Sequence, residues 1–258
     1  MKAWRVGLVV LGVVLLAVVS LFWFLPARWV VPSLQARLHG LRLDGVSGSL
    51  WDGHADRLIA TDGRLLGRMD WQLSRLSLFG KGALSLQLEG PQLAFRGQMQ
   101  RLGDDSVHWQ DVHLHLDLGL TTHATPWGRP QGTLEVDIPE ALVQNQWPMR
   151  LAASGQWRDA SVQTAQGKVS LGTLSWHAQS NHGVLIGSLA DAGPEGPLKV
   201  SGSFELSTLG WHYRLEAVPR GRQPALQRWL TILGPVAFDG TLRLEQRGGV
   251  AKLLKGSS

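Results

Sequence analysis

The sequence predicts a mainly β protein: a single N-terminal transmembrane helix, then a large curved antiparallel β-sheet domain of about 12–14 strands, with a short helix near the C-terminus. Three observations predict this fold. A long apolar run opens the chain, apolar residues then recur at every second position, and Gly, Pro, Asn or Asp interrupts these later runs every roughly 8–15 residues. Alternation with frequent turns is typical of antiparallel sheets that bury one face.

The first element is a membrane anchor over residues 6–27, which include no charged side chain. A helix of that length spans about 33 Å, enough for the roughly 30 Å of bilayer hydrocarbon. Trp4 lies near one end and Trp23 and Trp29 near the other, where indole rings prefer to sit. A cleavable signal peptide is the alternative, but the run is longer than such a peptide needs and no small-residue cleavage motif precedes Arg28.

The short basic tail before this run favours a cytoplasmic N-terminus. We therefore expect a single-pass protein of the cell inner membrane in three parts. Residues 1–27 form the cytoplasmic tail and anchor, residues 28–44 a juxtamembrane connector, and residues 45–258 a periplasmic β-rich domain. The apolar stretch Ala27–Leu38 predicts a helix beside the membrane, which Pro32 would interrupt.

The strands are predicted from alternation, as at Val112–Leu118, where polar His113 and His115 occupy intervening positions. Each such segment has one buried and one solvated face. The other runs of this kind are Leu84–Leu88, Leu134–Ile138, Val169–Ala178, Leu185–Leu189, Leu198–Leu206, Trp211–Ala217 and Phe238–Leu244. Glycine followed by Ser or Thr and an apolar residue recurs, as in Gly187-Ser188-Leu189, and predicts a turn or bulge before a strand.

The exception near the C-terminus is Pro224–Leu233, which predicts a helix. Proline is tolerated in a first helical turn, and Gly234 ends the pattern. One face carries apolar residues at helical spacing: Leu226, Trp229, Leu230 and Leu233.

The composition excludes several classes of function. The chain has 258 residues, 44% hydrophobic and 17% charged, so it can bury a core. The absence of Cys excludes disulfides, thiolate zinc sites and cysteine nucleophiles. The 25 basic and 20 acidic residues are scattered, so no nucleic-acid partner is expected. The chain has 12 Trp, and most fit a role in the core or in a groove between sheet faces, with exposed interface anchors as the alternative. Those that lie near no basic cluster are Trp51, Trp71, Trp109, Trp127, Trp147, Trp157, Trp176 and Trp211.

The sequence contains no phosphate-binding loop, dinucleotide fingerprint, metalloprotease motif, nucleophile elbow or EF-hand loop. His113, His115 and Asp117, with His108, could share a metal because alternate strand residues face one way. The solvated face of a strand explains the same pattern and is the favoured interpretation. We therefore expect no catalytic residue, no cofactor and no metal.

The motifs resemble the type II secretion system protein N family, in the order Leu25-Pro26-Ala27, Val46–Ala55, Met69–Leu73 and Arg228–Gly234 followed by Asp239-Gly240. The resemblance implies a non-enzymatic, bitopic inner-membrane protein of the type II secretion system. Its implied partners are the inner-membrane assembly platform and the outer-membrane secretin. The motif residues are expected to be structural: Gly48, Leu50, Trp51, Gly53, Trp71, Gly234 and Gly240.

Two alternatives remain open. A curved antiparallel sheet behind one anchor is also typical of periplasmic lipid-transfer or lipid-binding proteins, which would make lipid a partner. A closed inner face favours the secretion scaffold, and an open apolar trough favours lipid binding. A metal- or His-dependent hydrolase rests on His113 and His115 alone.

Overall fold

The computed structural model describes residues 25–29, 31, 40–76, 82–103, 105–120 and 125–249. The chain divides into two compact units, Met1–Gly90 and Pro91–Ser258. The predicted anchor, residues 6–27, lies outside the described residues except at its last three positions, and so does most of the predicted helix at 27–38. Within the described part of the chain, no helix has both the length and the apolar character needed to cross a bilayer.

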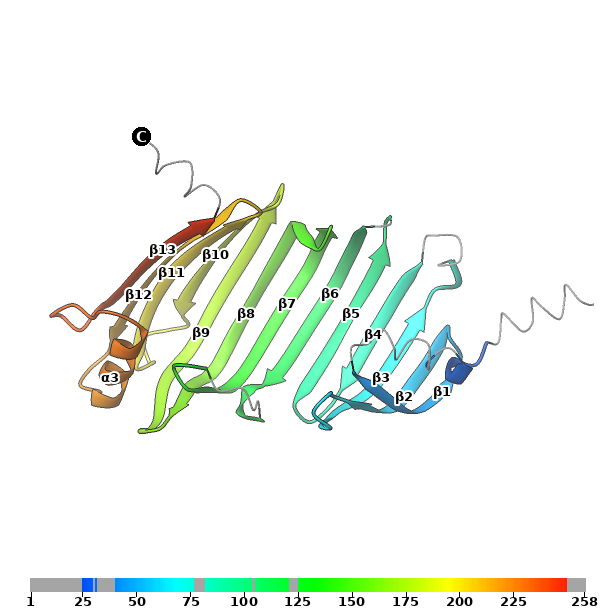
Figure 1. The fold of residues 1–258 in the computed structure, drawn as a ribbon, viewed down its shortest axis with the longest axis horizontal. Helices are drawn as coiled ribbons and strands as arrows, with labels where there is room; N and C mark the ends of the chain where they lie inside the picture. The colour runs from blue at the N-terminus through cyan, green and yellow to red at the C-terminus, as the bar shows by residue number, and fades with distance from the viewer. Residues whose placement is uncertain are drawn as a thin grey trace, which may run out of the picture. The chain divides into compact units, whose positions relative to one another are not determined.

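The first unit is an antiparallel meander of four strands (Figure 1). Each strand pairs with its neighbour in sequence. The buried apolar residues in its strands and their first turn are Leu43, Trp51, Ala55, Leu58 and Leu88. The strands are β1 (Arg42–Gly48), β2 (Asp52–Ile59), β3 (Leu65–Leu73) and β4 (Ala83–Glu89).

The second unit contains nine strands, also antiparallel and paired in chain order (Figure 1). Its short hairpins turn through residues with positive φ, such as Asn145 and Gln146 at 50° and 64°, as tight hairpin turns require. The strands are β5 (Leu93–Arg101), β6 (Ser106–Asp117), β7 (Arg129–Gln144), β8 (Trp147–Thr164), β9 (Gly167–Asn181), β10 (Val184–Asp191), β11 (Leu198–Ser207), β12 (Gly210–Pro219) and β13 (Leu242–Gly249), with a short 3₁₀ turn η2 (Leu118–Leu120).

Bulges interrupt the longest strands of this unit. Asp111 and Asp159 have φ of 50° and 49°, and the pairing register shifts beside each of them. A bulge places an extra residue in one strand and bends it locally. These shifts keep the apolar side chains of strands as long as 18 residues on one face.

Helix α3 (Pro224–Leu233) follows β12, with Pro224 in its first turn. Leu226, Trp229 and Leu230 are buried, and the Gly234 amide donates a hydrogen bond to the Leu230 carbonyl at 3.3 Å. The helix packs against apolar residues of β8, β9 and β11–β13: Ala160, Val162, Val169, Leu171, Leu174, Leu198, Val200, Ala217 and Leu242.

The structure confirms a mainly β chain with thirteen antiparallel strands in its described residues and a helix at Pro224–Leu233. The curvature of the sheet stays a prediction. The last strand begins at Leu242, not at Phe238. Asp239 and Gly240 form a turn instead: Gly240 has φ of 80° and donates to the Ala237 carbonyl at 2.9 Å.

Candidate functional site

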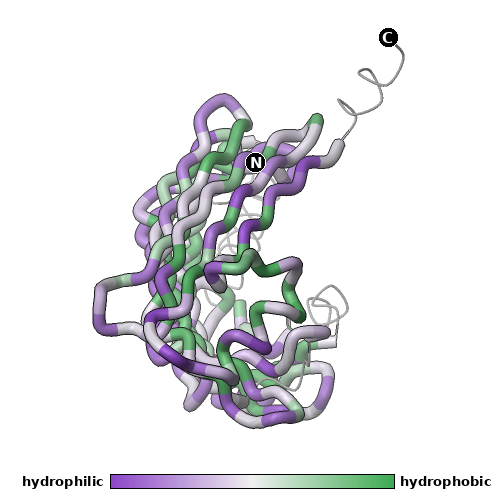
Figure 2. The backbone as a smooth tube through the Cα atoms, turned by 90° about the vertical axis from the view of Figure 1, so that its left-hand side faces the viewer, coloured by the Kyte–Doolittle hydropathy of each residue, from purple (hydrophilic) through white to green (hydrophobic). Residues whose placement is uncertain are grey.

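The second unit has a continuous apolar face, formed by residues that sit directly opposite one another on neighbouring strands. Apolar and polar residues alternate along these strands (Figure 2). We call this surface the apolar face. Its central members are Leu114 and Leu116 of β6, Leu134 and Val136 of β7, Gly155 and Trp157 of β8, Leu174 and Trp176 of β9, Gly187 and Leu189 of β10, Gly202 and Phe204 of β11, and Tyr213 and Leu215 of β12.

Helix α3 buries one end of the apolar face, where Val162, Leu171 and Val200 are each at most 5% exposed. Away from the helix the side chains are only half-buried, including Leu134, Val136, Trp176, Phe204 and Tyr213. Farther along, Leu206 and Trp211 are 37% and 40% exposed. A contiguous apolar surface of this kind marks an interaction site more often than a passive surface.

Aromatic rings lie over glycines on this face. An alanine Cβ at Gly155 would lie 2.6 Å from the Trp176 ring, and one at Gly187 would lie 2.1 Å from the ring of Phe204. The same arrangement recurs where Trp211 covers Gly248. A ring that lies over a glycine covers backbone that the glycine itself leaves bare, so the glycine positions also form part of the apolar surface.

The opposite face is polar and carries cross-strand ion pairs. Arg158 contacts Glu135 at 2.8 Å, and Arg243 contacts Glu216 at 3.2 Å. On β13, hydrogen bonds from Arg214 and then from His212 lower the pKa of the Glu245 carboxyl. All these pairs are at least partly solvated, so each adds little stability and together they define a charged surface.

The histidines considered as metal ligands lie on this polar face. His113 contacts Asp137, whereas His115 contacts Glu135 at 3.8 Å. Asp117 accepts a hydrogen bond from a nearby backbone amide at 2.8 Å. Each histidine therefore faces its own carboxylate on β7. Among the residues that the structure describes, no three His, Asp or Glu side chains are grouped closely enough to hold a metal ion.

The motif residues of the first unit converge at the turn between β1 and β2. The Leu50 amide donates to the Leu25 carbonyl at 2.9 Å, and the Trp71 indole donates to the Leu50 carbonyl at 3.2 Å. Gly48 has φ of 82°, a conformation that favours glycine. Gly53 has a different requirement, because a Cβ there would lie 2.5 Å from the Trp71 ring.

The remaining motif residues differ in their surroundings. Trp51 is buried, at 5% exposed, whereas Leu50 is half-buried. Gly234 ends α3, and a Cβ there would lie 2.6 Å from the Leu244 side chain. Gly240 serves the turn before β13. These contacts give the motif residues local packing and turn geometry, and a structural role for the set stays a prediction.

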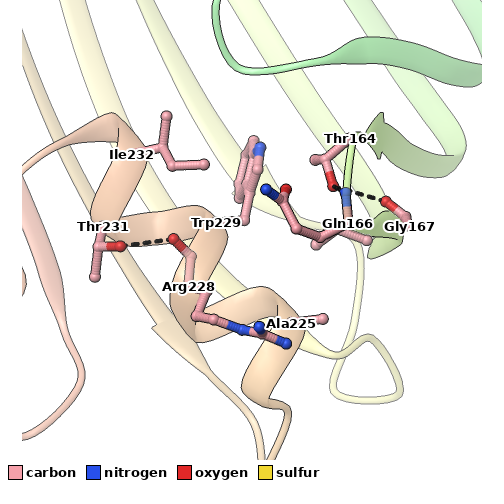
Figure 3. Close-up of a pocket in the computed structure, with 9 residues that line it drawn as sticks. Thr164, Gln166, Gly167, Ala225, Arg228, Trp229, Thr231 and Ile232 are labelled. Carbon is pink, nitrogen blue, oxygen red and sulfur yellow. Dashed lines mark hydrogen bonds between the residues drawn. The ribbon is translucent and has the colours of Figure 1, made fainter.

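A cleft lies beside α3 and was not predicted from the sequence (Figure 3). It consists of two adjoining pockets, which we call together the α3 cleft. One pocket of about 280 Å³ lies between the helix and the turn at 164–167, and the other, of about 500 Å³, lies against the turn at 125–129. Thr164, Gln166 and Ile232 line both. Trp229 joins them, because its indole donates to the Trp127 carbonyl at 2.8 Å.

An antiparallel meander with one apolar and one ion-paired face defines a class: mainly β proteins whose strands pair in chain order. The family follows from comparison with known proteins. Residues 39–245 match the family model for type II secretion system (T2SS) protein N. That match spans well over half of the chain, so this chain belongs to the type II secretion system protein N family, and the resemblance seen in its motifs is confirmed.

Two curated relatives agree with this family. The chain is 27% identical over 154 residues to type II secretion system protein N of Aeromonas hydrophila, covering 57% of this chain and 60% of the relative. It is 29% identical over 174 residues to the protein of the same name from Klebsiella pneumoniae, covering 62% of this chain and 64% of the relative. The chain thus spans less than two thirds of the length of either. No solved structure gives a significant match.

Proposed function

We propose that this protein is a non-enzymatic component of the type II secretion system that assists export of folded proteins by contacting the assembly platform and the outer-membrane secretin. Family membership over residues 39–245 is the observation that carries the proposal. The names of both relatives support it. The family implies these partners, which are proteins. A protein partner also suits the fold, because a strand edge and an exposed apolar surface are both open to a second chain.

The edge of β13 is the surface that best suits a protein partner. β12 pairs with one side of β13, and on the other side a bridge from Val236 reaches Leu242 at its start. Within the described residues, the strand beyond Leu242 has no further pairing on that side. An extended segment of a partner would complete the hydrogen bonds of this edge, with side chains giving selectivity.

Photocrosslinking in cells tests this proposal. A crosslinking residue replaces Arg247 on the edge, and the matched control replaces Gln156, which is also exposed on the polar face but lies in a strand paired on both sides. Adducts with platform proteins or secretin from position 247, and fewer from 156, are the expected result. If neither position formed adducts with secretion proteins in cells that assemble the system, that result would contradict the proposal.

Acyl-chain binding is a second candidate function, and one observation favours it: the apolar face stays half-exposed beyond α3. A crosslinking aromatic residue at Trp176 or Phe204 reports what covers that face. Phospholipid or lipopolysaccharide adducts at both positions, with few at Gln156, would support lipid binding. Adducts made only to protein would contradict it.

The membrane topology is also a proposal: a cytoplasmic tail and anchor at 1–27, a connector at 28–44 and a periplasmic domain at 45–258, with the N-terminus cytoplasmic. The chain has no Cys, so single-cysteine variants report accessibility directly. Gln156→Cys should react with an impermeant maleimide once the outer membrane is permeabilised, and Ala3→Cys only after lysis. The reverse labelling pattern would mean that the protein has the opposite topology.

A further inference from the structure

The α3 cleft combines apolar walls with two arginines. Val169, Ala225, Trp229 and Ile232 supply apolar surface to the smaller pocket. Arg228 lines that pocket, and Arg129 lines the larger one. Of the described residues that line either pocket, none is acidic. The cleft is therefore partly apolar, and its only charged lining residues among those described are the two arginines; its uncharged polar side chains are Thr125, Gln163, Thr164, Gln166 and Thr231.

These two arginines differ from most of those on the sheet. Arg158, Arg214 and Arg243 each contact a carboxylate. In the part of the chain that the structure describes, the guanidinium groups of Arg129 and Arg228 contact none, and Arg228 donates only through Nε, to the Pro224 carbonyl at 3.3 Å. Figure 3 shows the Arg228 side chain extending beside Ala225, below Gln166. Both cations are thus available to an anionic group.

We propose that the α3 cleft binds one acyl chain of an anionic phospholipid, with its head group at the rim that carries Arg129 and Arg228 and its chain against Trp229 and Ile232. This inference deepens the second candidate function and rests on it. Apolar walls with a few placed polar groups are typical of small-molecule sites, and pockets of these volumes suit a slender ligand. Arginine matches the geometry of phosphate oxygens and binds them through charge-assisted hydrogen bonds.

The position of the cleft gives this site a further property. α3 closes one end of the apolar face, and Trp229 contributes both to that buried core and to the cleft wall. A chain held at Trp229 would therefore lie against the buried core that α3 closes. The arginines would select the head group, while the apolar face itself carries no charge with which to select one.

The test uses the full chain in nanodiscs of phosphatidylcholine that contain a trace of photoactivatable phosphatidylglycerol or, in parallel, photoactivatable phosphatidylcholine. We expect phosphatidylglycerol to label peptides that cover residues 125–129 or 225–232 several-fold more than phosphatidylcholine does. The double variant Arg129→Gln, Arg228→Gln should lower that labelling about five- to tenfold. Arg222→Gln is the matched control, because Arg222 is exposed beside α3 but lines neither pocket.

The outcomes distinguish a failure of the α3 cleft site from a failure of acyl-chain binding as a function. Equal labelling of the cleft by both lipids, or no effect of the double variant, would overturn the head-group site. Labelling of the apolar face without labelling of the cleft would overturn the cleft while leaving acyl-chain binding intact. No lipid label anywhere in residues 91–258 would overturn both. Circular dichroism of the double variant establishes that it is folded.

Discussion

Replacing Gly155 with alanine tests whether aromatic rings lie over glycines on the apolar face. The new Cβ would lie 2.4 Å from the Glu135 carbonyl oxygen and 2.6 Å from the Trp176 ring, so each contact must open by about 1 Å to reach ordinary van der Waals distance. Overpacking of this kind costs about 1–3 kcal/mol, and the lower entropy of the unfolded alanine chain returns about 0.4–1 kcal/mol. We expect a net loss of about 1–2 kcal/mol.

The assay is thermal unfolding of the full chain, followed by circular dichroism. A loss of that size should lower the melting temperature by about 2–8 °C for a unit of this length. Gly193→Ala is the matched control, because a Cβ there has no atom within 4 Å, and its stability should change by less than about 0.5 kcal/mol. Adding Trp176→Ala should remove the ring contact, so the two substitutions should couple favourably. A Gly155→Ala protein as stable as its parent would refute the arrangement.

Three further predictions concern other parts of the fold. Leu230→Ala should cost about 2–5 kcal/mol in urea unfolding, because the side chain is 1% exposed, while Ile232→Ala, at 56% exposed, should cost little. Burial opposes ionisation of Asp191, but hydrogen bonds from Arg220 and a backbone amide outweigh it, so the pKa of this carboxyl is lowered. The Asp191–Arg220 pair therefore stabilises the fold at pH values above the pKa of aspartate in the unfolded chain. That stabilisation is lost as the pH falls through the lowered pKa of Asp191 in the folded protein. Asp191→Asn should cost about 2–3 kcal/mol at pH 7 and progressively less below pH about 4, whereas a constant cost would contradict the linkage. Trp71→Phe should cost about 1 kcal/mol through its lost hydrogen bond at 3.2 Å, and an unchanged stability would argue against that bond.

Local patterns predicted the elements well. The boundaries of α3 follow from Pro224 in its first turn and from Leu226, Trp229 and Leu230 at helical spacing, and the structure reproduces them. Alternation identified eight of the thirteen strands, because each of those eight has one apolar face; the strands outside the alternating runs are β1, β2, β3, β5 and β8. The start of the last strand was placed too early, at Phe238, because alternation alone overlooked the turn at Gly240.

The candidate site could not be predicted in the same way, because it depends on which strands face each other. Trp176 covers Gly155 through the register of β8 and β9, which bulges shift and which no local pattern fixes. The α3 cleft joins Trp229 to Trp127, which are 102 residues apart. Arg129 and Arg228 cannot be distinguished from other surface arginines in the sequence, because the side chains that surround each of them depend on the fold.

The unusual content of tryptophan has a physical reason in this fold. The indole N–H groups of four tryptophans donate to backbone carbonyls of other strands or turns: Trp71 to Leu50, Trp147 to Gly183, Trp157 to Gln131 and Trp229 to Trp127. Phenylalanine could cover the same surface but could not make these bonds, and tyrosine would place its hydroxyl farther from the sheet.

That use of tryptophan bears on function. Beyond α3, half-exposed side chains shield the sheet's backbone hydrogen bonds from water, since the helix covers only one end of the apolar face. Trp176 and Phe204 do this beyond the helix, where each ring lies over a glycine of the neighbouring strand. Such a face is stable before anything binds it, so an acyl chain or a partner segment could arrive and leave without unfolding the strands beneath. A face that depended on its occupant for stability would instead have to become ordered at each binding event, which would lower its affinity.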